Sequence, residues 1–85
     1  MMVWVTDAKY QDEYKVWLKF SDSTEGIVDF EPILKKDHRK VIHDLIYKTN
    51  FTDFTIEMDT LVWSNGADFA PEYLYDLCKK SKNVA

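Results

Sequence analysis

The stretch LVWSNGADFAPEYLYDL, residues 61–77, decides the architecture of this chain, because it joins a strand-like segment to a helix-like one. Its apolar start ends at Trp63. Asn65 and Gly66 both tolerate a positive φ angle, so the backbone can reverse direction directly after the tryptophan. Pro71 suits the first turn of a helix, where the N–H group that proline lacks is not needed. The stretch therefore predicts a strand, a sharp turn and a helix in immediate succession.

The polar residues of this turn have a structural and a functional interpretation. In the structural one, Asp68 offers an acceptor to backbone N–H groups of the turn, and Glu72 lies near the positive end of the following helix. In the functional one, Asn65, Asp68 and Glu72 line a ligand pocket beside Trp63. We favour the structural interpretation, because the sequence ties no other polar residue to this group. The candidate motif residues are Trp63, Asn65, Gly66, Asp68 and Pro71.

Length and composition predict a single small α+β domain spanning residues 1–85, with 46% hydrophobic and 15% aromatic residues. The formal net charge of −4 weighs against a nucleic-acid partner, since phosphate contact needs clustered Lys and Arg. No apolar run approaches the roughly 20 residues that span a bilayer, so no membrane association is expected. Cys78 is the single cysteine, which excludes an intrachain disulfide. Together with a start that lacks signal-peptide features, it indicates the cytoplasm.

Alternation of apolar and polar residues predicts a mostly antiparallel sheet. In YKVWLKF, residues 14–20, Val16 and Leu18 share one face, and Trp17 lies on the other between two lysines. Near residue 37 the period becomes helical. The predicted fold class is α+β, in two layers, with a sheet of four or five strands packed with two helices. Strands are predicted at residues 2–7, 14–20, 26–30, 52–58 and 60–64, and helices at residues 38–48 and 71–80.

The predicted core follows from the same periodicities. The segment EPILKK, residues 31–36, is interpreted as a one-turn connector that tucks Leu34 under the sheet. The predicted core residues are Val16, Leu18, Phe20, Val28, Phe30, Leu34, Val41, Ile42, Leu45, Ile46, Phe54, Ile56, Leu61, Trp63, Leu74 and Leu77.

Signatures of catalysis, metal binding and cofactor binding are weak. His38 and His43 are five residues apart, a spacing that turns them away from each other on a helix. Cys78 lies on the apolar stripe of the last predicted helix, where cysteine behaves as a small hydrophobic residue. The acid pairs of the chain are interpreted as solvated surface carboxylates. We therefore predict no catalytic residue, no metal site and no cofactor, and a protein that is not an enzyme.

Aromatic residues outnumber what so small a core can absorb. Partly exposed aromatic rings are typical anchors of protein interfaces, and an open sheet edge also invites pairing with another chain. The alternative, that these rings cover the rim of the domain's own core, stays open. The expected partner is another protein or a second copy of the chain. The candidate interface residues are Trp4, Trp17 and Tyr75, with Tyr10 and Tyr47 as further surplus aromatics.

Two segments of the sequence resemble one known family. VWSNGADFAPEYLY, residues 62–75, is similar to the W-x-N-G-x-D-x-x-P-x-x-L-Y ending of the family catalogued as domain of unknown function 2442. YKVWLKFSDSTEGIVDFEPIL, residues 14–34, resembles the strand, acidic turn, strand and D-x-x-P-L segment of that family. Ser64 stands where the family often has proline, and the helix predicted around residues 41–48 is longer than the usual insert.

The resemblance implies a small, mostly bacterial, uncharacterised α+β protein, with no established catalytic residue to carry over. Some members carry a helix-turn-helix segment, which suggests regulatory use, and small stand-alone members look like partners in two-gene, toxin–antitoxin-like arrangements. We therefore predict a non-catalytic protein-interaction or regulatory module, with an antitoxin-like role as its most specific form. One alternative is a nucleic-acid accessory domain that uses the basic clusters at residues 35–40 and 79–82. Another is a ligand-binding or enzyme domain at the turn of residues 65–72.

Overall fold

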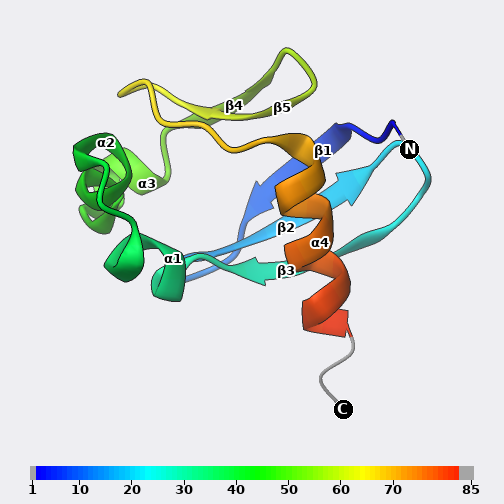
Figure 1. The fold of residues 1–85 in the computed structure, drawn as a ribbon, viewed down its shortest axis with the longest axis horizontal. Coiled ribbons are helices and arrows are strands. Elements are labelled where there is room, and N and C mark those ends of the chain that lie inside the picture. Colours follow the sequence, from blue (N-terminus) through cyan, green and yellow to red (C-terminus); the bar gives the residue numbers. More distant parts are fainter. Residues whose placement is uncertain (1, 83–85) are drawn as a thin grey trace.

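The computed structural model describes residues 2–82, with side chains through residue 80, so the Lys82 side chain of the second basic cluster lies outside the described part. Figure 1 shows α4 (Pro71–Lys82) crossing the sheet of the first three strands, with a separate hairpin beyond it. The strands are β1 (Val5–Tyr10), β2 (Lys15–Phe20), β3 (Glu25–Asp29), β4 (Phe54–Glu57) and β5 (Thr60–Trp63). The remaining helices are α1 (Glu31–Lys36), α2 (Lys40–His43), the 3-10 helix η1 (Asp44–Ile46) and α3 (Lys48–Phe51).

The strands form two antiparallel sheets, one of three strands in the order β1-β2-β3 and one of the two strands β4 and β5. The α+β class is therefore confirmed, whereas a single sheet of four or five strands is wrong. The hairpin is hydrogen-bonded to β1 at its turn, where the Val5 N–H group donates to the Asp59 carbonyl oxygen at 2.9 Å. The other side of β5 is occupied by the chain itself, through an isolated bridge between Val62 and Asp68.

Strand β2 sets the two faces of the larger sheet. Val16, Leu18 and Phe20 are buried, because alternation places all three on the side that packs against the core. Trp17 lies on the opposite face, where it is half-buried and pairs in register with Ile27 of β3. The alternation predicted for residues 14–20 is thus confirmed.

The helix predicted at residues 38–48 is wrong, since the chain forms α2, η1 and α3 in its place. The helical path ends at Tyr47, whose φ of −74° and ψ of 119° are extended. The break is held by hydrogen bonds to backbone oxygens: the Tyr14 hydroxyl donates to Ile46 at 2.6 Å, and the Asn50 amide donates to Asp44 at 3.0 Å. The connector predicted at residues 31–36 is helical, so the count of two helices is also wrong.

Helix α4 begins at Pro71, as the turn sequence predicts, and packs against β3. Its Leu74 and Cys78 side chains are fully buried. Across residues 2–82, no helix combines the length and apolar character that a membrane crossing requires.

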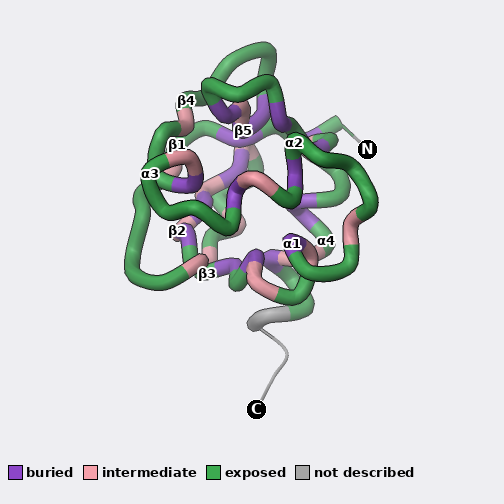
Figure 2. Tube along the Cα trace, turned by 90° about the vertical axis from the view of Figure 1, so that its left-hand side faces the viewer, coloured by how far each residue is buried: buried purple, intermediate pink, exposed green. Residues whose placement is uncertain are grey.

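Most of the predicted core is confirmed, and Figure 2 marks the buried segments along the strands and in α1 and α4. The exceptions are apolar residues that are exposed on the surface and apolar residues that are only partly buried against the core. Exposed instead of buried are Val41, Ile46 and Ile56, and partly buried are Phe54 and Leu77. Buried apolar residues that the core prediction omits are Val3, Val5, Phe51, Ala67, Phe69, Tyr75 and Cys78.

Candidate functional site

The turn after β5 is closed by backbone hydrogen bonds and by Asn65. The Trp63 N–H donates to Ala67 O, and the Gly66 N–H donates to Trp63 O, each at 2.9 Å. Gly66 has a φ of 94°, a backbone conformation that would be strained for a residue with a side chain. The Asn65 side chain accepts from the Ala67 N–H at 3.0 Å and donates to the Val41 carbonyl oxygen at 2.9 Å. Asn65 therefore closes the turn with one hydrogen bond and links the turn to α2 with another.

Trp63 anchors this turn in the core. Its indole N–H donates to the Phe51 carbonyl oxygen at 2.7 Å. Its ring centroid lies 5.7 Å from Phe30, 5.7 Å from Phe69 and 6.0 Å from Phe51. The tryptophan of the motif thus contributes both a buried hydrogen bond and a large apolar contact.

Asp68 has a different place from the one predicted for it. The side-chain hydrogen bonds of the turn come from Asn65, whereas the Asp68 carboxylate is exposed. The hydrogen bond with Asp37 and the charge of Asp37 raise the pKa of the Arg39 guanidinium above the ordinary value, and the negative charge of Asp68 adds to this effect. Asp68 therefore acts on a cation from a distant part of the sequence, not on the turn.

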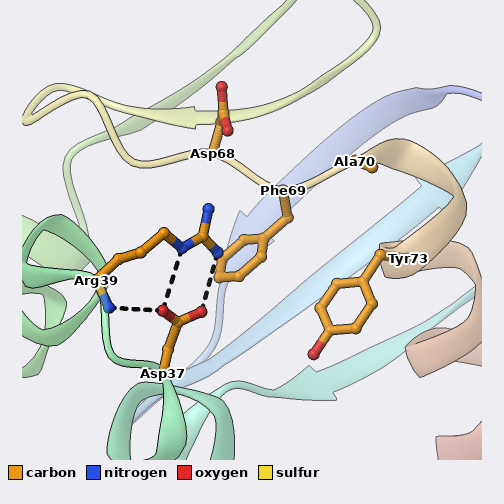
Figure 3. A pocket seen from close by; sticks show the side chains of 6 residues that line it. All are labelled: Asp37, Arg39, Asp68, Phe69, Ala70 and Tyr73. Atoms are coloured by element: carbon orange, nitrogen blue, oxygen red, sulfur yellow. Dashed lines mark hydrogen bonds and ion pairs between the residues drawn. The ribbon is translucent and has the colours of Figure 1, made fainter.

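An open hollow of about 400 Å³ lies beside the turn, between the loop after α1 and the start of α4 (Figure 3). Arg39 forms a fork on Asp37, with Nε 3.1 Å from Oδ1 and Nη2 2.9 Å from Oδ2. The guanidinium carbon lies 6.0 Å from the centroid of the Phe69 ring, and that ring stacks on Tyr73 at 5.8 Å. The lining residues are Asp37, Arg39, Asp68, Phe69, Ala70 and Tyr73.

The ion pair in this hollow keeps both of its partners, Asp37 and Arg39, in the charged form. Hydrogen bonds from the Arg39 side chain and backbone lower the pKa of Asp37 to about 2. The carboxyl pKa values of Glu13 and Asp22 are likewise lowered, and the pKa values of Lys35, Arg39 and Lys48 are raised, so each of these shifts favours the charged form. General acid catalysis at neutral pH needs an acid whose pKa is raised towards 7. Asp37 is the opposite case, because its carboxylate is held in the charged form by a guanidinium that lies beside aromatic rings.

We predict that Arg39→Ala raises the pKa of Asp37 from about 2 towards 3.8, the ordinary value. Because the native pKa is lowered, the pair stabilises the fold above pH 3.8, and this contribution is lost as the pH falls towards 2. A titration of the Asp37 carboxyl carbon by NMR measures the shift. The control is Lys40→Ala, which breaks only the exposed ion pair with Asp44. Equal Asp37 midpoints in all three proteins would contradict the prediction.

Neither histidine lies in a metal-binding cluster. His38 and His43 border a second hollow, next to Asp37 and Asp44. In the part of the chain that the structure describes, no group of three or more His, Cys, Asp or Glu side chains is arranged to hold a metal ion.

The predicted interface aromatics lie in different environments. Trp4 is 42% exposed, and Tyr47 is 66% exposed. Tyr75 is buried at 6% exposure, and its hydroxyl donates to Asp22 Oδ2 at 2.6 Å, so its assignment to an interface is corrected. Its ring packs edge-on against Phe20 at 5.2 Å, which makes it a core residue. Tyr10 packs against Phe51, and its hydroxyl donates to the Glu13 carbonyl oxygen.

Trp17 belongs to a surface that we call the outer face, which is the side of the three-stranded sheet turned away from the core. At its centre Lys9, Trp17 and Ile27 form one row across the strands. Ile27 is 46% exposed, and the Trp17 indole N–H donates to Glu25 at 3.3 Å. The outer face consists of Asp7, Lys9, Lys15, Trp17, Lys19, Glu25, Ile27 and Asp29.

The sequence signal for this surface is incomplete. Alternation identifies Lys15, Trp17 and Lys19 as its middle strand. Ile27 gives no such signal, because it sits beside the buried Val28 in a short apolar run. The register with β2 is needed to place Ile27 next to Trp17.

Comparison with known proteins identifies a family and no individual relative. The family model described as "Protein of unknown function (DUF2442)" matches residues 5–80. No curated protein and no solved structure matches the chain. The matched region includes the whole outer face, the turn and most of α4.

Proposed function

We propose that this chain, which belongs to the family of proteins of unknown function DUF2442, is a non-catalytic interaction module that binds a partner protein through its outer face. The family match confirms the resemblance seen in the sequence. The choice of the outer face comes from the surface chemistry of the chain itself.

The observation that supports this proposal is a sheet with one uncovered side. The core and α4 occupy the inner side, where Val16, Leu18 and Val28 are buried. On the outer side an apolar centre, Trp17 and Ile27, is surrounded by charged residues of both signs. Protein interfaces have this arrangement of an apolar centre and a polar rim, and tryptophan is among the residues that dominate their binding energy.

The state of the basic residues supports a protein partner over a nucleic acid. In the cluster at residues 35–40, Lys35 pairs with Glu31 at 2.9 Å, and Arg39 pairs with Asp37 at 2.9 Å. Lys40 pairs with Asp44 at 3.1 Å. A phosphate backbone would have to compete with these carboxylates. The nucleic-acid alternative therefore has the weaker support.

The finer part of the proposal is a regulatory role, as the antitoxin-like half of a two-gene pair. It rests on what the family resemblance implies together with the absence of a catalytic constellation in our sequence analysis. A small-molecule site at the turn is the second candidate, because the Arg39 guanidinium is held beside Phe69 and Tyr73 in the hollow. NMR shifts of Arg39 and Tyr73 on adding an anionic aromatic compound would favour that candidate.

We predict that Trp17→Thr weakens partner binding by about 30-fold or more, since a hot-spot residue contributes at least about 2 kcal/mol. Threonine keeps the strand preference of the position while it removes the ring. The measurement uses the tagged full chain, purified from its native host, with the solution mass and stoichiometry of the complex. Tyr47→Ser is the matched control, because it removes an exposed ring far along the chain from the outer face. A chain that stays monomeric and retains no stoichiometric protein would refute the proposal.

A further inference from the structure

We infer that the open edge of β3 receives an extended, cationic segment of the partner protein as a fourth strand of the sheet. This inference rests on the proposed function and specifies how the partner is held. It commits to one occupant, a foreign strand with basic side chains at alternate positions.

The backbone of β3 is available on the side away from β2. The Phe30 N–H donates to Tyr14 O, and the Phe20 N–H donates to Thr24 O, each at 2.8 Å. In an antiparallel pair, hydrogen-bonded positions alternate with positions whose backbone groups point away. By this alternation Glu25, Ile27 and Asp29 turn their N–H and C=O groups outward, and all three residues are exposed. Strand β3 is the last strand of its sheet, so these groups form a ready template for another strand.

The charges of the outer face alternate across the sheet and end in acids at this edge. One row runs Asp7, Lys19, Glu25, and a second row places Lys15 opposite Asp29. Opposite charges on directly facing residues stabilise a strand pair. A basic residue of an added strand would therefore be favourable opposite Glu25 and opposite Asp29, and an apolar residue would be favourable opposite Ile27.

The same charges disfavour a second copy of the chain as the occupant. Two β3 strands paired antiparallel about Ile27 would set Glu25 of each copy against Asp29 of the other. Like charges directly opposite each other destabilise a strand pair. The acids thus block self-association at an edge that has no proline to protect it.

The neighbouring strand shows what such a segment looks like. Lys15, Trp17 and Lys19 of β2 already face Asp29, Ile27 and Glu25, which is the basic, apolar, basic pattern. The intervening positions of an added strand would face the side of Val28, which is apolar. Figure 1 shows that α4 crosses β3 and that its last turns extend past this strand, so an added strand would lie under the helix.

The test uses a synthetic peptide, YKVWLKF, that copies residues 14–20, and the intact chain. A second peptide, with both lysines replaced by glutamate, is the matched control. We expect the basic peptide to bind at least about tenfold more tightly than the acidic one, since two facing charge pairs change sign. Binding should weaken with added salt. Hydrogen exchange should slow at the amides of Glu25, Ile27 and Asp29, which a new ladder would engage.

Variants of the edge separate charge from strand addition. The double substitution E25K and D29K should reverse the preference between the two peptides, whereas Glu57→Lys, an exposed acid at the end of β4, should leave it unchanged. Equal binding of both peptides, or unchanged exchange at the three amides, overturns the fourth strand. If a partner whose binding depends on Trp17 is still retained, that outcome leaves the proposed function standing. A dimer joined through β3 would also overturn the inference, in favour of a second copy.

Discussion

Replacing Trp63 by alanine is expected to lower the free energy of unfolding by about 3–5 kcal/mol, the range for removing a large buried aromatic side chain. The indole is buried among Phe30, Phe51 and Phe69, so its loss leaves a cavity bordered by these three rings. A domain of this size is stabilised by only about 5–15 kcal/mol in total. Urea denaturation, followed by circular dichroism, measures the difference.

A second substitution separates the hydrogen bond of Trp63 from its packing. Trp63→Phe keeps most of the apolar volume but removes the N–H that donates to the Phe51 carbonyl oxygen. A buried acceptor left without its donor costs about 1–3 kcal/mol, so this variant should fall between wild type and alanine. Trp4→Phe, at an exposed position, is the control and should change stability by no more than about 0.5 kcal/mol. Equal losses for the two phenylalanine variants would contradict the anchoring role of Trp63.

Elements whose cause lies within a few residues could be predicted from the sequence. Strand β2 follows from its own alternation, and the start of α4 follows from Pro71 after a turn that Asn65 and Gly66 permit. In each case a local steric or periodic rule decides the outcome, and no distant partner overrides it.

Elements decided by distant partners could not be predicted. The periodicity of residues 38–48 is helical. The Tyr14 hydroxyl, 32 positions away in sequence, nevertheless donates a hydrogen bond to the Ile46 carbonyl oxygen and so holds the break in the helix. Likewise, the backbone at Asp68 forms a bridge with Val62 and so occupies the side of β5 where a further strand could pair. Tertiary hydrogen bonds outweigh helix propensity here, because propensity differences are only fractions of a kcal/mol per residue.

The candidate site shows the same limit. The pairing of Asp37 with Arg39 joins residues two apart in the basic cluster of residues 35–40, so it could have been found in the sequence. The approach of Asp68 to Arg39 and the bond from Asn65 to Val41 could not, because they depend on how the turn lies on α2. The charge rows of the outer face likewise need the register of three strands.

Phe51 and Ile56 give the clearest case of a core assignment reversed by tertiary structure. Alternation over residues 52–58 places Ile56 in the core, but it is 38% exposed on β4. Phe51 is the last residue of α3, and its ring is fully buried. It packs at 5.3 Å from Tyr14 and at 5.9 Å from Phe30, centroid to centroid.

We therefore expect Phe51→Ala to lower the free energy of unfolding by about 3–5 kcal/mol. Ile56→Thr, which keeps a β-branched side chain on the exposed strand, should lower it by less than about 1 kcal/mol. Parallel urea titrations of the two variants measure the contrast, and the slope of each titration shows whether unfolding stays cooperative. The alternation pattern alone predicts the reverse order, so a larger loss for Ile56→Thr would mean that Ile56, which faces Leu61 across the hairpin, contributes more to the core than its exposure indicates.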